Sequence, residues 1–350
     1  MTEKTDIKSL SIEELRERFA QLKEPAFRAG QVFSWLHQRR AQSFDEMTNL
    51  SKPLRETLGE VFYIPHITVK QKLVSQLDGT VKYLYELEDG ETVEAVFMRY
   101  HHGNSLCIST QVGCRMGCTF CASTLGGCVR NLTAAEMLCE VYTAEQDTGE
   151  KVSSLVLMGI GEPLDNYDNV VRFLRLLSDK NGMNMSLRHV SLSTCGLVPR
   201  IYDLAKLRLG LTLSVSLHAP NDQIRSHTMP VNRSYNIDEL LAACRHYADA
   251  TSRRISFEYA LIDGVNDSEQ NARELAKRLK GMLCHVNLIP VNPVTEREHK
   301  ASTRGAVERF TAVLEREKIA VTVRRRLGAD INAACGQLRR EGQHKPNNPE

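Results

Sequence analysis

The chain has 350 residues, of which 42% are hydrophobic and 25% are charged, a balance typical of a folded globular protein rather than a disordered one. Its formal net charge of +2 excludes a protein that binds nucleic acid through a large overall positive charge. The polar N-terminus predicts no signal peptide, and no apolar run approaches the roughly 18 residues that a membrane helix requires. Ten cysteines without a secretion signal predict a reducing, cytoplasmic location and thiols used for metal binding or catalysis.

Residues 1–66 are predicted to form an N-terminal helical domain. Ser11 and Glu14 form a capping-box pattern before the first apolar stripe. Apolar residues at helical spacing predict a second helix across residues 27–37, and Pro53 lies in the first turn of a predicted third helix. Small helical domains of this kind often contact a partner, although a packing function explains the pattern equally well.

Residues 67–100 change to a pattern typical of β-strands. Two Asp-Gly pairs, Asp78-Gly79 and Asp89-Gly90, separate three runs rich in β-branched and aromatic residues. Asp-Gly between such runs is a strong signal for a tight hairpin turn. The segment is therefore predicted to be a three-stranded β-meander that leads into the main domain.

Residues 101–341 alternate between strand-like and helix-like segments. The predicted strands are residues 105–109, 154–158, 189–193, 211–216, 255–259 and 285–289, and the predicted helices between them include residues 134–145, 169–178, 237–248 and 268–280. Near-continuous apolar strands alternating with helices predict a parallel sheet of the α/β class. Six such units are too few for a closed eight-stranded barrel, so we expect a (βα)₆ partial TIM barrel with its chemistry at the carboxyl ends of the strands. The polar residues 342–350 are predicted to be a disordered tail.

Three cysteines, Cys114, Cys118 and Cys121, form a C-x₃-C-x₂-C pattern that we call the cysteine triad. Three thiolates can bind three irons of a four-iron, four-sulfur cluster and leave the fourth iron without a protein ligand. An open coordination position is typical of a catalytic metal centre. The alternatives are three core thiols or a zinc site with Cys128 or Cys139 as its fourth ligand. Otherwise the remaining cysteines are predicted to be packing residues: Cys128, Cys139, Cys195, Cys244 and Cys284.

The triad spacing resembles the signature of radical S-adenosylmethionine (SAM) enzymes. The wider segments Cys107–Cys121 and Ala333–Leu338 resemble the RlmN/Cfr family of dual-specificity RNA methyltransferases, and the resemblance extends from the helix at Gln31 to Leu338. It implies that residues 101–341 form a radical SAM core with the (βα)₆ fold. It also implies two cofactors, a [4Fe-4S] cluster held by the triad and SAM bound beside it.

A glycine-rich segment, Gly159-Ile-Gly-Glu-Pro, follows the second predicted strand. Glycine lets a backbone approach a small ligand closely, and a carboxylate can accept hydrogen bonds from an ammonium group. The resemblance implies that Gly161, Glu162 and Pro163 hold the amino group of SAM, whereas a tight strand-to-loop turn is the alternative. It implies further SAM contacts at other strand ends, which otherwise would be polar residues that satisfy the backbone: Ser193, Ser216, Leu217, His218 and Asn292.

The resemblance implies three catalytic residues. Cys335 becomes the methylated intermediate, although a single cysteine near a C-terminus is more often a buried thiol; the thiolate is the nucleophilic form, and nearby cations favour it. Cys107 acts as the resolving cysteine that releases the product. Glu94, flanked by apolar residues on a strand, matches the proton acceptor, and the sequence leaves open whether Glu94 or Cys107 takes the proton. Asn332 stands where the family pattern has an aspartate.

The implied activity is methylation of carbon 2 of an adenine in 23S rRNA and of an adenine in the tRNA anticodon loop, with two SAM molecules per methyl group. The triad loop, residues 111–124, resembles the RlmN branch rather than the Cfr branch, whose members methylate carbon 8 and confer antibiotic resistance. The target base must be unstacked to reach the barrel, and residues 1–66 are expected to contact the RNA. A flavodoxin or ferredoxin is expected as electron donor, and the protein is expected to be a monomer without a membrane partner. The alternatives are carbon 8 methylation and a non-enzymatic iron–sulfur redox sensor that binds RNA.

Overall fold

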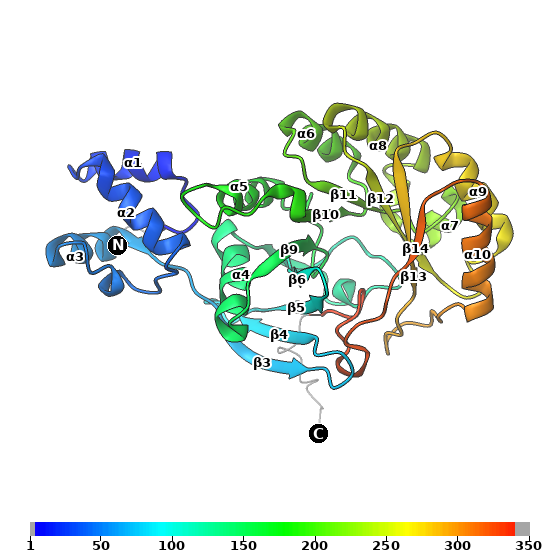
Figure 1. Cartoon of the computed structure of the whole chain (residues 1–350), viewed down its shortest axis with the longest axis horizontal. Helices are drawn as coiled ribbons and strands as arrows, with labels where there is room; N and C mark the ends of the chain where they lie inside the picture. Colours follow the sequence, from blue (N-terminus) through cyan, green and yellow to red (C-terminus); the bar gives the residue numbers. More distant parts are fainter. Residues whose placement is uncertain (1–3, 340–350) are drawn as a thin grey trace, which may run out of the picture.

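The structure is a computed structural model in which residues 4–339 are described. The predicted tail at residues 342–350 lies outside this part of the chain. An N-terminal module of helices lies beside a large curved sheet that is covered by further helices (Figure 1). The α/β class and the partial barrel predicted from the sequence are confirmed.

The N-terminal module contains the three predicted helices. They are α1 (Ile12–Gln21), α2 (Ala26–His37) and α3 (Lys52–Val61), with a short 3₁₀ helix, η1 (Phe44–Glu46), before α3. The predicted capping box is present, because the Ser11 hydroxyl accepts the Glu14 N–H at 3.2 Å while the Ser11 N–H donates to the Glu14 carboxylate at 2.7 Å. The short strand β1 (Thr5–Asp6) pairs in parallel with β2 (Phe62–Tyr63) and joins the two ends of the module.

A ten-stranded sheet forms the centre of the molecule, in the order β14-β13-β12-β11-β10-β9-β6-β5-β4-β3. Its strands are β3 (Thr68–Val74), β4 (Val81–Glu86), β5 (Thr92–Tyr100), β6 (Gly103–Cys107), β9 (Val152–Leu157), β10 (Val190–Thr194), β11 (Thr212–Ser216), β12 (Ile255–Leu261), β13 (Cys284–Pro290) and β14 (Val321–Val323). Neighbours from β6 to β14 are parallel, and those from β3 to β6 are antiparallel. The predicted meander therefore continues the barrel sheet through β6, and β14 adds a seventh parallel strand that we did not predict.

Helices cover the outer face of the parallel strands (Figure 1). They are α4 (Ala134–Thr148), α5 (Tyr167–Ser178), α6 (Val198–Leu207), α8 (Ile237–Thr251), α9 (Glu269–Leu279) and α10 (Arg304–Arg316). The short α7 (Asp222–Thr228) lies instead at the carboxyl end of β11. Short 3₁₀ helices, η2 (Ala122–Thr124), η3 (Leu187–His189), η4 (Pro230–Arg233) and η5 (Ala329–Ile331), lie in the connections. The buried side chains of the sheet and of these helices form one hydrophobic core that continues into the N-terminal module.

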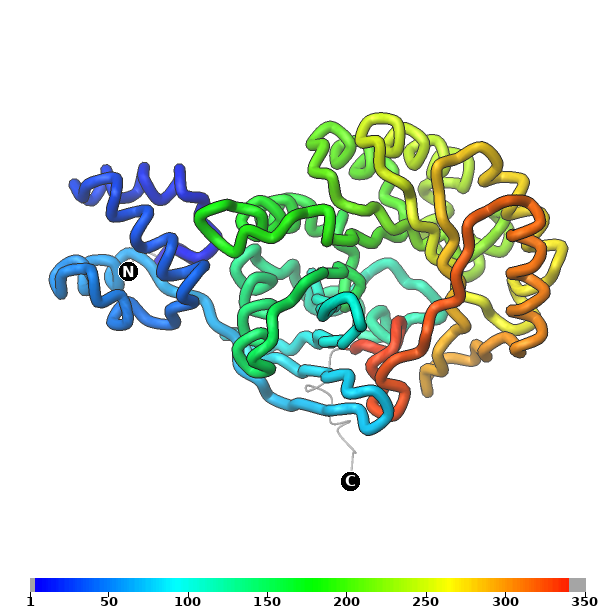
Figure 2. Tube along the Cα trace, viewed as in Figure 1, coloured from blue at the N-terminus to red at the C-terminus, as the bar shows by residue number. Residues whose placement is uncertain are grey.

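The N-terminal module packs against α4 and α5, as the trace in Figure 2 shows. Lys8 Nζ donates to the Pro65 carbonyl at 2.6 Å and to Cys139 Sγ at 3.2 Å. His37 Nδ1 lies 3.0 Å from the Tyr142 hydroxyl. These contacts are buried, so the module is fixed to the core rather than tethered by a linker. Within residues 4–339, no helix combines the length and apolar character needed to cross a membrane.

Candidate active site

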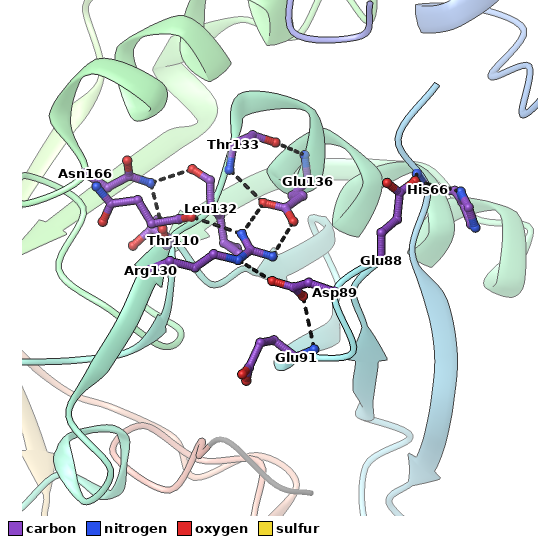
Figure 3. A network of polar contacts seen from close by, with 11 residues as sticks. His66, Glu88, Asp89, Glu91, Thr110, Arg130, Leu132, Thr133, Glu136 and Asn166 are labelled. Atoms are coloured by element: carbon purple, nitrogen blue, oxygen red, sulfur yellow. Dashed lines mark hydrogen bonds and ion pairs between the residues drawn. The ribbon is translucent and has the colours of Figure 1, made fainter. Parts of the chain in front are cut away.

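The cysteine triad lies on a loop, residues 114–127, that is closed at its base by a two-stranded hairpin of β7 (Gln111–Gly113) and β8 (Cys128–Asn131). Polar contacts fix this base to the core (Figure 3). The Asn166 amide donates to two backbone carbonyls, one on each side of the hairpin, both at 2.8 Å. Arg130 forms ion pairs with Asp89 at 2.6 Å and Glu136 at 2.8 Å. The loop therefore starts from a rigid base.

The triad loop and the carboxyl ends of the parallel strands enclose a cavity of about 150 Å³, which we call the triad cavity. Nearly all of the predicted cofactor residues line it: Cys114, Cys118, Cys121, Gly161, Glu162, Pro163, Ser193, Ser216, His218 and Asn292, together with Cys335. Residues far apart in the sequence meet here because parallel strands all end at the same edge of the sheet.

All three cysteines of the triad line the triad cavity. Among residues 4–339, no three His, Cys, Asp or Glu side chains surround one point closely enough to hold a metal ion. The thiols instead line the wall of the cavity, as ligands to separate irons of one cluster would. Burial raises the pKa of Cys114 to about 12 and raises that of Cys118, and the neighbouring thiols add to both shifts. Cys139, one proposed fourth zinc ligand, is instead buried against Lys8.

The glycine-rich segment after β9 holds Glu162 against the cavity. Gly161 has φ +105°, and a Cβ at this position would lie 2.6 Å from Gln111 Cβ, so only glycine fits. The Glu162 carboxylate accepts N–H groups from Leu164 at 3.1 Å and Cys195 at 2.7 Å. Burial raises the pKa of Glu162, and these hydrogen bonds oppose the shift. A bound ammonium group would complete the carboxylate's hydrogen bonding.

The ends of β11 and β13 contribute His218 and Asn292. Burial lowers the pKa of His218 to about 3, so its ring is neutral at pH 7, and its Nδ1 accepts the Ala260 N–H at 2.8 Å. Asn292 Nδ2 donates to the Cys335 carbonyl at 3.0 Å. Leu217 differs from the other predicted contacts, because its side chain packs in the hydrophobic core. Any contact of Leu217 with a cofactor would use its main chain.

Cys335 lies where two cavities meet. The second cavity, about 140 Å³, is lined by Cys107 and shares Cys335, Asn292 and Arg324 with the triad cavity. We call it the Cys107 cavity. Both thiols are free. The pKa of Cys107 is raised mainly by burial and secondly by the nearby charge of Cys335. The charge of a Cys335 thiolate also raises the pKa of Arg324. The Cys335 and Cys107 thiols therefore face the same small space, with a cation beside them.

The segment around Cys335 is held by the triad loop and by the β3–β4 hairpin. The Ala122 N–H donates to the Gly336 carbonyl at 2.8 Å. Asp330 accepts the Ser75 hydroxyl at 2.7 Å. Asn332, which replaces the aspartate of the family pattern, adopts the left-handed conformation that asparagine tolerates. These contacts position Cys335 from both sides.

Glu94 is the one predicted catalytic residue that lines neither cavity. Its carboxylate is buried, forms an ion pair with Lys82 at 2.6 Å and accepts the Arg339 N–H at 2.7 Å. It lies on β5, two residues from Val96, which does line the Cys107 cavity. The sequence showed the apolar neighbours of Glu94 but not its pairing with Lys82.

Sequence reasoning missed several residues that shape the site. Gln111 accepts the Glu162 N–H at 2.8 Å, and Arg297 donates to the Cys121 carbonyl at 3.3 Å. Cys195, predicted to be a packing residue, lines the triad cavity. The position of Gln111, three residues before the triad, is a sequence signal that could have indicated its contact with the site. Arg297 lies in a polar loop without any comparable signal.

Two family models match the chain. The Radical SAM superfamily matches residues 108–276. The Ribosomal RNA large subunit methyltransferase N-terminal domain matches residues 5–64.

Curated relatives match over nearly their whole length. A probable dual-specificity RNA methyltransferase RlmN from Alkaliphilus oremlandii is 55% identical over 339 residues, which cover 97% of this chain and 98% of the relative. One from Lachnoclostridium phytofermentans is 53% identical over 340 residues, with 97% and 96% covered. Among solved structures, a radical SAM methyltransferase from Sphaerobacter thermophilus matches with a TM-score of 0.90 and 43% identity, over 95% of this chain and 99% of that one.

Proposed function

This chain belongs to the RlmN family of dual-specificity RNA methyltransferases, and we propose that it methylates carbon 2 of an adenine in 23S rRNA and of an adenine in the tRNA anticodon loop. One observation carries the proposal: Cys335 lies where the triad cavity meets the Cys107 cavity. A thiol at this junction would face a cofactor bound in the triad cavity on one side and Cys107 on the other. A carrier of a methyl group between SAM and RNA needs this position.

The cofactors are a [4Fe-4S] cluster, held by Cys114, Cys118 and Cys121, and SAM. Bound together, they supply a radical that can take hydrogen from a C–H bond, which direct methyl transfer from SAM cannot achieve at an electron-poor ring carbon. Glu162 would bind the amino group of SAM, and the strand-end residues described above would hold the rest of it.

The chain's own residues divide the remaining work. Cys335 Sγ would carry the methyl group toward the base, while Asn292 fixes the Cys335 main chain. Glu94 would take the ring proton once Lys82 or the segment at Arg339 shifts, because both now contact its carboxylate. Cys107 Sγ would then attack Cys335 Sγ, so that the S–S bond forms as the bond from Cys335 Sγ to the base-bound carbon breaks. The electron pair of the broken bond would leave on that carbon, which takes a proton and becomes the methyl group of the released base. Cys107 is buried, whereas Cys335 is partly exposed.

The N-terminal module supports a contact with RNA. Its Phe27 ring is 61% exposed, with the Arg28 guanidinium 4.9 Å from the ring centroid. The Arg39 guanidinium lies 4.2 Å from the centroid of Trp35. Aromatic rings and guanidinium planes stack on unpaired bases, and arginines bind phosphates.

The domain boundaries follow from this assignment. Residues 1–66 would be the accessory RNA-contacting domain, residues 67–100 the meander, and residues 101–341 the catalytic core. We also propose that a flavodoxin or ferredoxin supplies electrons and that the protein acts as a cytoplasmic monomer.

The decisive experiment is anaerobic incubation with SAM carrying a labelled methyl group, a reductant and unmodified RNA. Mass spectrometry of the digested RNA should show labelled 2-methyladenosine, and 8-methyladenosine as the main product would reject the proposed position. Cys335→Ala should abolish labelling while leaving the iron content unchanged. Cys128→Ala is the matched control, because Cys128 lies in β8 at the base of the triad loop and lines neither cavity. Unchanged cellular function of Cys335→Ala would favour the redox-sensor alternative.

A further inference from the structure

Arg225, in α7, is the largest side chain that is completely buried, with no exposed surface. Its guanidinium donates to the backbone carbonyls of Leu217 at 3.1 Å, Cys195 at 2.6 Å and Ser216 at 3.1 Å. It also donates to the Asn232 amide oxygen at 3.0 Å. Every one of these acceptors is electrically neutral.

No ion pair within residues 4–339 involves this buried cation. The nearest link to a carboxylate is indirect, because Asn232 Nδ2 donates to Asp222 Oδ1 at 2.9 Å. Burying an ion without a paired opposite charge is costly, since neutral dipoles replace only part of the lost hydration. Consistent with this, burial lowers the pKa of Arg225. A buried charge of this kind needs a compensating charge nearby.

The triad loop packs against the end of α7. The Thr119 N–H donates to the Thr228 carbonyl at 2.9 Å, which joins the triad loop to the end of α7. Cys118 packs with Met229 and Val231, on the residues that follow α7. Cys118 also packs in the same apolar cluster as Cys195, whose carbonyl accepts from the Arg225 guanidinium at 2.6 Å. The guanidinium therefore lies within electrostatic reach of a triad ligand.

Arg225 also supports residues of the SAM site. The Cys195 peptide accepts from Arg225 through its carbonyl and donates to the Glu162 carboxylate at 2.7 Å through its N–H. The other two carbonyls that Arg225 holds belong to Ser216 and Leu217, at the end of β11. One side chain thus joins the ends of β10 and β11 behind the cavity.

We propose that Arg225 is the buried counter-charge of the cluster, a positioning residue whose cation offsets the negative charge of the three-thiolate iron–sulfur site. The inference rests on the proposed function, because it requires a cluster on the triad. A cluster with three thiolates carries net negative charge, and reduction adds one more electron to it. A fixed cation in a low-dielectric interior stabilises the reduced form more than the oxidised form. Arg225 therefore raises the reduction potential of the cluster.

The test is an anaerobic redox titration of the reconstituted full-length protein without SAM, followed by the electron paramagnetic resonance signal of the reduced cluster. Arg225→Gln removes the charge and should lower the ratio of reduced to oxidised cluster at least tenfold at a fixed potential, equivalent to about 59 mV for one electron. Arg225→Lys keeps a charge and should recover at least half of that shift. Arg172→Gln removes an arginine that pairs with Glu14 in the N-terminal module, and its potential should equal that of the wild type.

Asp222→Asn tests the effect of charge apart from that of packing. It removes the negative charge that partly balances Arg225, and it should therefore raise the reduction potential of the cluster. Loss of packing alone would not shift the potential in opposite directions in Arg225→Gln and Asp222→Asn. The inference is overturned if Arg225→Gln titrates like the wild type or if Arg225→Lys falls as far as Arg225→Gln. If Arg225→Gln assembles no cluster, Asp222→Asn decides alone, and an unchanged or lower potential refutes the proposal. A wild-type protein without any cluster signal would instead contradict the proposed function.

Discussion

Gly161 offers a sharp test of how the SAM site is built. In Gly161→Ala the new Cβ would lie 2.6 Å from Gln111 Cβ and 2.8 Å from the Gln111 nitrogen, at a backbone φ of +105°. Gln111 cannot easily move, because its side chain accepts the Glu162 N–H at 2.8 Å and donates to Asp165 at 2.9 Å. The backbone strain costs about 1–3 kcal/mol and the overpacking about 1–3 kcal/mol. The alanine lowers the entropy of the unfolded chain, which returns about 0.4–1 kcal/mol.

We therefore expect Gly161→Ala to lose roughly 2–5 kcal/mol of unfolding free energy. Gly90→Ala is the matched control, since Gly90 has φ +81° but no atom within 4 Å of the added Cβ. It carries only the backbone strain, about 1–2 kcal/mol, less the same entropy return of about 0.4–1 kcal/mol. Guanidinium unfolding followed by circular dichroism, under anaerobic conditions, measures both variants, and equal slopes make their midpoints comparable.

The same variant should weaken SAM binding, because the clash displaces the loop that carries Glu162. We expect at least a tenfold rise in the dissociation constant, roughly 1.4 kcal/mol, measured by calorimetry, with Gly90→Ala unchanged. If the two alanine variants unfold within about 0.5 kcal/mol of each other, the close approach of Gly161 to Gln111 does not constrain this loop, and the reasoning fails.

Three further changes test buried polar groups. Lys82→Met removes one partner of the buried ion pair with Glu94. We expect guanidinium unfolding to show a free energy of unfolding about 3–5 kcal/mol lower than that of the wild type, and a decrease below about 1 kcal/mol would contradict this expectation. Burial lowers the pKa of His37 to about 3 in the folded protein. Between pH 6.5 and 3 the imidazole is therefore protonated in the unfolded state alone, so the free energy of unfolding falls as the pH falls through that window. When the pH is lowered from 8 to 5.5, the free energy of unfolding of His37→Gln should fall by about 1.4 kcal/mol less than that of the wild type. Identical dependence of the two proteins on pH would refute this. Asn166→Ala removes the amide donor from the buried Thr110 and Leu132 carbonyls, of which the Thr110 carbonyl still accepts the Leu132 N–H at 3.1 Å. We expect a cost of roughly 1–3 kcal/mol in the same unfolding assay, and a cost below about 0.5 kcal/mol would contradict this.

The features that the sequence predicted correctly are those set by short-range patterns. The capping box at Ser11 and the hairpin turns at Asp78-Gly79 and Asp89-Gly90 depend on residues within one turn of each other, and the structure confirms all of them. The parallel strands were visible as apolar runs. Strand β14 was missed because its three residues are too few to show a pattern, and the hairpin of β7 and β8 is equally short.

The site shows the same division. The spacing of the cysteine triad, and with it the family and its cofactors, could be read from consecutive residues. Three other features could not be read from the sequence: the position of Leu217 in the core, the pairing of Glu94 with Lys82, and the position of Arg225 between two strand ends. Each depends on which distant segments pack together, and burial and charge compensation are properties of that packing rather than of the local sequence. The cysteine spacing thus predicted the chemistry, whereas tertiary structure decided which thiols, carboxylates and cations line the same cavities, because only a folded sheet brings all its strand ends to the same edge.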